Sequence, residues 1–157
     1  MCELSDFLRP DSVLTAVNAS GKRQALDVLS CFAARQTGVD STVIMDMLLQ
    51  REALGSTGIG GGVAIPHAKL KGITRLYGAA AILEKPIDFN SMDGEPVDIL
   101  FLLLAPEDSG ADQLQALARI ARQFQQQEFL KRIRRVRDPS ALFILLTETA
   151  PLQYASA

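Results

Sequence analysis

The run Val97–Leu104 constrains the fold of this chain more than any other segment. Seven of its eight residues are apolar, and Asp98 is the exception. Because successive side chains of a strand point to opposite faces, a strand formed here is apolar on both faces and needs cover on both. Strands of this kind occur in the middle of a sheet that has helices on each side. The run therefore predicts an α/β protein.

Two segments before this run carry apolar residues at helical spacing. They are Ala25, Val28, Leu29, Phe32 and Ala33 in the first segment, and Ile44, Met47 and Leu48 in the second. We expect Ser20 to cap the first helix and Gly38 to end it. Either Asp40 or Ser41 should cap the second helix. The second helix then ends near Arg51, immediately before a glycine-rich segment.

Three more helices are predicted after the apolar run. Their apolar residues are Leu114, Leu117, Ala118, Ala121 and Phe124 in the first, and Phe129, Leu130 and Ile133 in the second. Ser109 or Asp108 should cap the first of these. Asp138-Pro139 is typical of a helix start and predicts a last helix over Ser140–Thr149. A basic cluster at 131–137 is either a solvated helix face or a docking patch for an acidic partner.

The remaining apolar segments predict the strands and complete the fold class. Val13–Val17 is the first strand, after a short helical turn, and Val63–Ile65 is a short buried strand that Pro66 ends. Gly78–Leu83 is another strand, which Lys85-Pro86 should break, leaving 87–89 as an edge segment. We expect three or four strands after the first two helices. Together the elements predict a three-layer α/β/α sandwich around a small mixed β-sheet.

Length and composition limit the class of protein. A chain of 157 residues is expected to form a single domain over 1–157. Sixteen basic and eighteen acidic residues leave no global field for nucleic acid or an anionic membrane, and no apolar run is long enough to insert into a bilayer. The acidic N-terminal segment predicts a cytoplasmic protein. Cys2 and Cys31 have no metal or redox spacing, and Cys31 is expected in the core.

The segment Arg51–Ala68 holds the only histidine and five of the eleven glycines. Glycines permit positive φ and can turn several amide N–H groups toward one anion. His67 follows Pro66 and should emerge at a strand end, at the rim of that site. The phosphate-binding P-loop and the dinucleotide fingerprint do not fit, because a Gly-Lys-Ser/Thr and the third glycine are both missing.

From Glu52 to Ala68 the sequence resembles the active-site signature of the fructose/mannitol-type IIA components of the bacterial phosphoenolpyruvate-dependent phosphotransferase system. In that signature an acidic or amide residue leads to an apolar-Gly pair and then to apolar-Ala-apolar-Pro-His-small, and every constrained position is met here. The longer segment Arg51–Gly60 is most similar to the nitrogen-regulatory branch. The resemblance covers nearly the whole chain and implies the same α/β/α fold.

The resemblance implies a phosphocarrier enzyme of the phosphotransferase type, with a phosphohistidine intermediate. His67 would accept the phosphoryl group from a small HPr-like carrier, and Arg51 would stabilise it. In the nitrogen-regulatory branch the phosphorylation state is read by target proteins such as potassium transporters and sensor kinases. In the sugar-transport alternative a IIB component receives the group. No cofactor and no metal are implied, and an intact Arg51 and His67 argue against a pure binding module.

Several further residues are candidates for the same site. Ser56 and Thr57 either donate hydroxyl hydrogen bonds to the phosphoryl group or satisfy the backbone of a turn. Glu52 either orients Arg51 or is an exposed charge. Gln113 stands where relatives commonly have a second histidine, and its amide can donate a hydrogen bond but cannot titrate. The expected phosphate-binding loop consists of Ser56, Thr57 and four glycines, Gly58, Gly60, Gly61 and Gly62.

Overall fold

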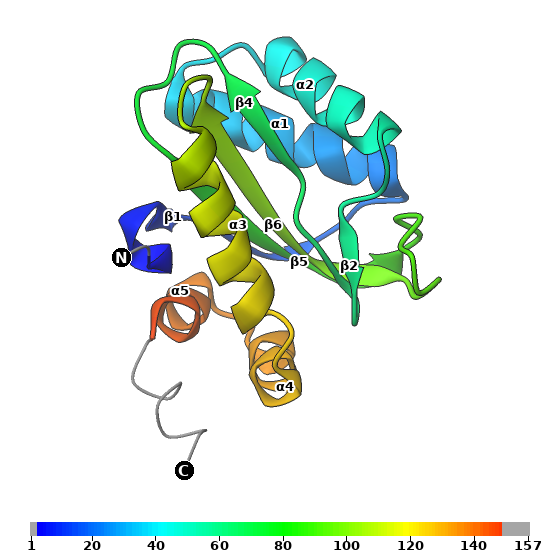
Figure 1. Ribbon diagram of the computed structural model, residues 1–157. Helices are drawn as coiled ribbons and strands as arrows, with labels where there is room; N and C mark the ends of the chain where they lie inside the picture. The colour runs from blue at the N-terminus through cyan, green and yellow to red at the C-terminus, as the bar shows by residue number, and fades with distance from the viewer. Residues whose placement is uncertain (1–2, 149–157) are drawn as a thin grey trace.

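Six strands form one mixed sheet at the centre of the computed structural model, which describes residues 3–148 (Figure 1). Along the main path the strand order is β1-β5-β6-β3-β2, and β4 pairs with β6 beyond the end of β3. β6 pairs in parallel with β3 and β4 and antiparallel with β5. The strands are β1 Leu8–Val17, β2 Gly58–Gly60, β3 Val63–Ala64, β4 His67–Leu70, β5 Tyr77–Ile87 and β6 Val97–Pro106.

Helices cover both faces of this sheet, as the apolar run predicted (Figure 1). On one side, α1 (Lys22–Thr37) and α2 (Ser41–Ala53) form a core with Leu100, Leu102 and Leu104 of β6. On the other side, α3 (Gly110–Gln123), α4 (Gln127–Arg135) and α5 (Pro139–Thr147) pack on the alternate β6 residues, together with the 3-10 turn Leu4–Asp6. The three-layer α/β/α sandwich is therefore confirmed.

The register of β4 decides on which face His67 lies. His67 pairs with Leu103, whose side chain belongs to the core beneath α3, whereas Ala68 and Leu70 belong to the core beneath α1 and α2. Because side chains alternate along a strand, His67 and Lys69 are on the α3 face. Within residues 3–148, β4 pairs with β6 alone, so His67 lies on an edge strand.

Most predicted helix ends are confirmed. Gly38 ends α1 in the left-handed conformation with φ 80°, and Asp40 caps α2 by accepting a hydrogen bond from the Thr42 amide. Asp138 caps α5, with Pro139 at its first position. The expectation for Ser20 was wrong, because the N-cap of α1 is Gly21 and the Ser20 amide instead donates to the Gln24 side chain.

Three strand predictions need correction. β5 continues through Pro86 to Ile87 and lies between β1 and β6, so Pro86 neither breaks it nor leaves an edge segment. Proline is tolerated because the ladder is irregular between Ile82 and Ile87, where no regular amide donor is needed. The chain also resumes as a strand directly after Pro66, so His67 begins β4. Five strands follow the first two helices rather than three or four.

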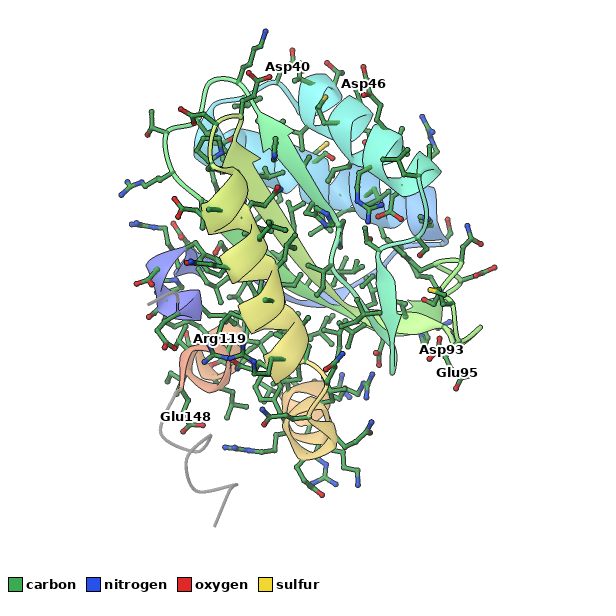
Figure 2. All side chains as sticks on the ribbon, viewed as in Figure 1. Asp40, Asp46, Asp93, Glu95, Arg119 and Glu148 are labelled. Carbon is green, nitrogen blue, oxygen red and sulfur yellow. The ribbon has the colours of Figure 1, made fainter. Side chains whose placement is uncertain are left out.

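Two residues expected in the core are exposed. Leu114 is 68% exposed because the buried face of α3 is turned toward Gln113, Ala116, Ile120 and Gln123. The polar residue Gln123 can be buried there because its side-chain amide donates to the Leu146 carbonyl and accepts from Arg119, which also belongs to α3 and is labelled in Figure 2. Cys31 is exposed as well. Cys2 and Thr149, the end of the expected last helix, lie outside the described residues.

Candidate active site

The structure brings His67 and Arg51 into direct contact. Arg51 lies in the last turn of α2, and its Nε–H donates to Nε2 of His67 at 3.2 Å, across 16 residues of sequence. The glycine-containing segment between them forms the β2–β3 hairpin, which returns the chain to the sheet beside the end of α2. The two residues most strongly expected to form the site are therefore adjacent in space.

A second hydrogen bond fixes the tautomer of the His67 ring. Nδ1 lies 2.8 Å from the carbonyl oxygen of Ile65. A carbonyl can only accept, so Nδ1 carries the proton and Nε2 of the neutral ring keeps its lone pair. That lone pair points to the Arg51 guanidinium. The ring is thus held with Nε2 available as a nucleophile.

The surroundings of His67 favour this neutral form. Burial of the ring lowers the pKa of His67 below its usual 6.5, and the positive charge of Arg51 lowers it further. The hydrogen bond to the Ile65 carbonyl and the negative charge of Glu52 act in the opposite direction. The net effect is a lower pKa, so the ring is neutral at pH 7.

The Arg51 side chain is held by the loop that follows its helix. Nη1 of Arg51 donates to the carbonyl oxygen of Gly55 at 2.9 Å, while Nε faces His67. This bond fixes the plane of the guanidinium relative to the ring. Guanidinium N–H groups match the oxygens of a phosphoryl group in charge and geometry.

Glu52 is buried beneath this loop, so its interpretation as an exposed charge was wrong. Its carboxylate accepts a hydrogen bond from the Thr57 amide at 3.1 Å and another from the Thr57 hydroxyl. Lys22, at the first position of α1, completes the group with Nζ at 2.9 Å from Glu52 Oε1. Glu52 therefore ties α1, α2 and the loop together. Sequence reasoning missed Lys22, because a lysine in the first turn of a helix looks like an ordinary surface charge.

The hydroxyl groups of the loop are used by the protein itself. The Ser56 hydroxyl donates to the Phe89 carbonyl at 2.7 Å and accepts from the Gly58 amide at 3.0 Å. The Thr57 hydroxyl donates to Glu52. These contacts support the interpretation that both residues satisfy the turn rather than face a ligand.

The four glycines of the expected phosphate-binding loop lie in the β2–β3 hairpin. Gly58 and Gly60 belong to β2, and Gly61 and Gly62 form the turn, with φ of 95°, 68° and 85° at Gly60, Gly61 and Gly62. Only glycine adopts such a run of positive φ without strain. A phosphate-binding role of these glycines stays a prediction.

Side chains from other elements bind the hairpin turn. The Gly61 amide donates to Asp93, which lies on the segment between β5 and β6 (Figure 2), at 3.1 Å. The Gly61 carbonyl accepts from Nη2 of Arg134 at 2.8 Å, and Arg134 also donates to both oxygens of Asp98. One member of the basic cluster is therefore a structural clamp. In the described part of the chain, the hydrogen bonds of Gly61 go to these neighbours and not to His67.

Gln113 is buried in the first turn of α3 and faces the sheet on the side where His67 lies. This placement is compatible with the expected role of Gln113 beside the acceptor ring. For metals, residues 3–148 contain no group of three His, Cys, Asp or Glu side chains placed to hold an ion. No helix in the same range is long and apolar enough to cross a membrane.

Known proteins resemble this chain over nearly its whole length. The family model for the phosphoenolpyruvate-dependent sugar phosphotransferase system, EIIA 2, matches residues 6–149. The nitrogen regulatory protein of Bradyrhizobium diazoefficiens is 48% identical, over 91% of this chain and 94% of that protein. The nitrogen regulatory protein of Klebsiella oxytoca is 37% identical, over 93% and 91%.

A solved structure agrees with these sequence relatives. The crystal structure of nitrogen regulatory protein IIA-Ntr from Neisseria meningitidis has a TM-score of 0.87 and 28% sequence identity to this chain, covering 92% of this chain and 99% of that one. Fold, family model and relatives point to one assignment. The chain belongs to the EIIA type-2 family of the phosphoenolpyruvate-dependent sugar phosphotransferase system, and within it to the nitrogen-regulatory branch.

Proposed function

We propose that this protein is a phosphocarrier that accepts a phosphoryl group on Nε2 of His67 from the phosphohistidine of an HPr-like protein. The observation that carries the proposal is the Arg51 Nε–H placed 3.2 Å from Nε2, on a ring whose other nitrogen is bonded to the Ile65 carbonyl. A neutral nitrogen nucleophile and an adjacent guanidinium are what transfer to an imidazole requires.

The transfer step balances without a further reactant. The Nε2 lone pair of His67 forms a new N–P bond while the N–P bond of the donor imidazolium breaks. The electron pair of the broken bond returns to the donor ring, which leaves as neutral imidazole. Each ring keeps the proton on its other nitrogen, and on His67 that proton stays bonded to the Ile65 carbonyl. Metaphosphate-like charge develops on the moving oxygens, beside the Arg51 guanidinium.

In this proposal Arg51 has one role before transfer and another after it. Before transfer its Nε–H marks the direction of the lone pair and its charge disfavours ring protonation. After transfer the same N–H groups face the phosphoryl oxygens, while Nη1 remains anchored on Gly55. The helix end and the loop therefore supply a positioned cation rather than a base.

The output of the phosphocarrier is regulatory in this proposal. We infer that the phosphorylation state is read by target proteins of nitrogen and potassium metabolism, such as a transporter or a sensor kinase. The relatives named nitrogen regulatory protein support nitrogen regulation over delivery of the group to a IIB component for sugar uptake. We further propose that residues 1–157 act as one EIIA type-2 domain in the cytoplasm, which agrees with the family match over 6–149.

The test is phosphorylation with purified components. Incubation with phosphoenolpyruvate, the first enzyme of the system and an HPr-like carrier should add one acid-labile phosphoryl group to the wild-type protein. His67→Ala should gain none while it keeps a cooperative thermal transition. A phosphoryl group on the His67→Ala protein would overturn the proposal. Omission of the carrier should abolish labelling, which separates transfer by the carrier from direct transfer by the first enzyme.

A further inference from the structure

The pair Lys22–Glu52 is the most buried ion pair near the site. Lys22 Nζ lies 2.9 Å from Glu52 Oε1, and the two side chains are 19% and 5% exposed. The ammonium group also lies 4.7 Å from the centroid of the Phe89 ring, which excludes water on that side. The charges therefore neutralise each other in a poorly hydrated place, where an unpaired charge acts strongly on its neighbours.

Glu52 directly follows Arg51 in α2, and the Arg51 guanidinium bonds the His67 ring, so the charge of Glu52 can act on that ring. The Glu52 carboxylate raises the pKa of His67, which means that it favours positive charge at the ring and disfavours negative charge there. Glu52 has no hydrogen bond to His67 or Arg51 within residues 3–148, since its carboxylate binds Thr57 and Lys22. Its influence on the ring is therefore electrostatic and depends on how fully Lys22 cancels it.

Phosphorylation changes what this field does. Phosphorylation adds roughly two negative charges at the His67 ring, and these charges repel the Glu52 carboxylate if that carboxylate is not compensated. We propose that Lys22 compensates the charge of Glu52 and thereby sets the phosphoryl-transfer equilibrium at His67. The inference rests on the proposed function, and it assigns to Lys22 a positioning and electrostatic role without contact to the reacting atoms.

The direction of each variant follows from charge alone. Lys22→Met keeps the length of the side chain but leaves Glu52 unpaired, so the phosphorylated protein becomes less favourable relative to the phosphorylated carrier. Glu52→Gln leaves Lys22 unpaired and should act in the opposite direction. The double variant Lys22→Met/Glu52→Gln has no charge at either position and should return toward wild type. A purely structural role does not predict this restoration.

The experiment measures the equilibrium between phosphorylated HPr-like carrier and this protein. We expect Lys22→Met to shift the equilibrium constant roughly threefold to thirtyfold toward the carrier, the scale for one uncompensated charge in the neighbourhood of a phosphoryl group. Lys22→Arg should stay within about twofold of wild type, because it keeps the charge. Lys131→Met is the matched control, since it removes a lysine charge from an exposed side chain.

A second measurement uses the unphosphorylated protein. The pKa of His67, followed by NMR of the ring, should rise in Lys22→Met and fall in Glu52→Gln, with the double variant between them. All variants keep Arg51 of α2, which contacts the ring, and Lys69, which lies on the same face of β4. If Lys22→Met does not fold, Glu52→Gln and the double variant still test the direction of the effect.

The outcomes separate this inference from the proposed function. A wild-type equilibrium in Lys22→Met, with His67 still phosphorylated, overturns the role of Lys22 and leaves the phosphocarrier intact. Failure of the double variant to move back toward wild type also overturns it. Absence of phosphorylation in the wild-type protein overturns the proposed function itself, and with it the transfer equilibrium that Lys22 is proposed to set.

Discussion

The end of α2 and the turn of the β2–β3 hairpin differ in what their polar groups do. Both belong to the segment expected to form one anion site. At the end of α2, Arg51 Nε–H donates to the lone pair on Nε2 of His67, and the same lone pair can bond a phosphoryl group instead. At the hairpin turn, Gly61 is already bonded to Asp93 and Arg134. The polar groups at the end of α2 therefore remain available to a ligand, whereas those of the hairpin turn stabilise the fold.

The comparison predicts that a change at the end of α2 affects chemistry far more than stability. Arg51→Ala should slow phosphoryl acceptance roughly tenfold to a thousandfold, the scale for losing one donor at a developing charge. Arg51→Lys should fall between this variant and wild type, because it keeps the charge but loses the planar fork. Single-turnover transfer from the carrier measures both. A wild-type rate for Arg51→Ala would remove the distinction between the two regions.

Acid should act on the same region by removing the lone pair. The pKa of His67 is lowered, so the rate should reach half its maximum only below pH 6.5 and then fall about tenfold per unit as the pH drops further. Because the folded pKa lies below the unfolded one, His67 contributes stability above pH 6.5 that is lost as the pH falls through the folded pKa. A rate that already halves at 6.5 or above would contradict the assigned environment of the ring.

A change at the hairpin turn should instead affect stability more than chemistry. Arg134→Met removes the bonds to Asp98 and to the Gly61 carbonyl and should lower the free energy of unfolding by about 1–2 kcal/mol, a modest value because both partners are partly exposed. The transfer rate should stay within about threefold of wild type. Arg135→Met, an exposed neighbour, should change stability by less than about 0.5 kcal/mol. Urea titration beside transfer kinetics gives both values.

A hundredfold slower transfer in a folded Arg134→Met protein would show that the hairpin takes part in catalysis. In that case the glycine amides would regain their predicted role. Slower transfer in a protein that is partly unfolded without urea would point instead to partial unfolding, which the urea titration detects as an unfolded fraction at zero denaturant.

The smallest predicted effect concerns Gln113, which lies in α3, in the helical layer opposite to that of Arg51. Wild-type transfer should follow one ionisation between about pH 5 and 8, that of His67, and Gln113→His should add a second. Gln113→Asn, which cannot titrate, is the matched control. Identical pH profiles for wild type and Gln113→His would place position 113 outside the site.

The fold and the central pair could be predicted because the relevant signals are local. The uniform run Val97–Leu104 required cover on both faces, and Pro66 placed His67 at the end of a strand, whereas His67 in fact begins the next one, β4. Leu114 shows the limit of periodicity, since it was assigned to the apolar face of its helix while the fold exposes it and buries Gln113. The prediction that Pro86 breaks its strand was wrong for a related reason. A strand tolerates proline where its pairing with the neighbouring strand is irregular, and that irregularity involves β6 as well as β5.

The pairing of Lys22 with Glu52 could not be predicted from the sequence either, and the reason is again physical. Its partner Glu52 lies thirty residues further along the chain, and nothing near Lys22 in sequence indicates a buried carboxylate. The same holds for Arg134, which differs from its exposed neighbours only through Asp98 and the hairpin. Long-range pairing of charges depends on the folded geometry, and sequence patterns report mainly on neighbours.

The bond from Nδ1–H of His67 to the Ile65 carbonyl makes the imidazole regioselective. The Nδ1 edge is committed to a buried residue of the protein's own backbone, so only one of the two isomers of phosphohistidine can form without breaking that bond. The modified protein should therefore carry the Nε2 isomer alone, which ³¹P and ¹⁵N chemical shifts distinguish from the other. A receiving protein then meets the phosphorus atom in a single orientation, which restricts the partners to those whose own nucleophile can approach along the Nε2–P axis.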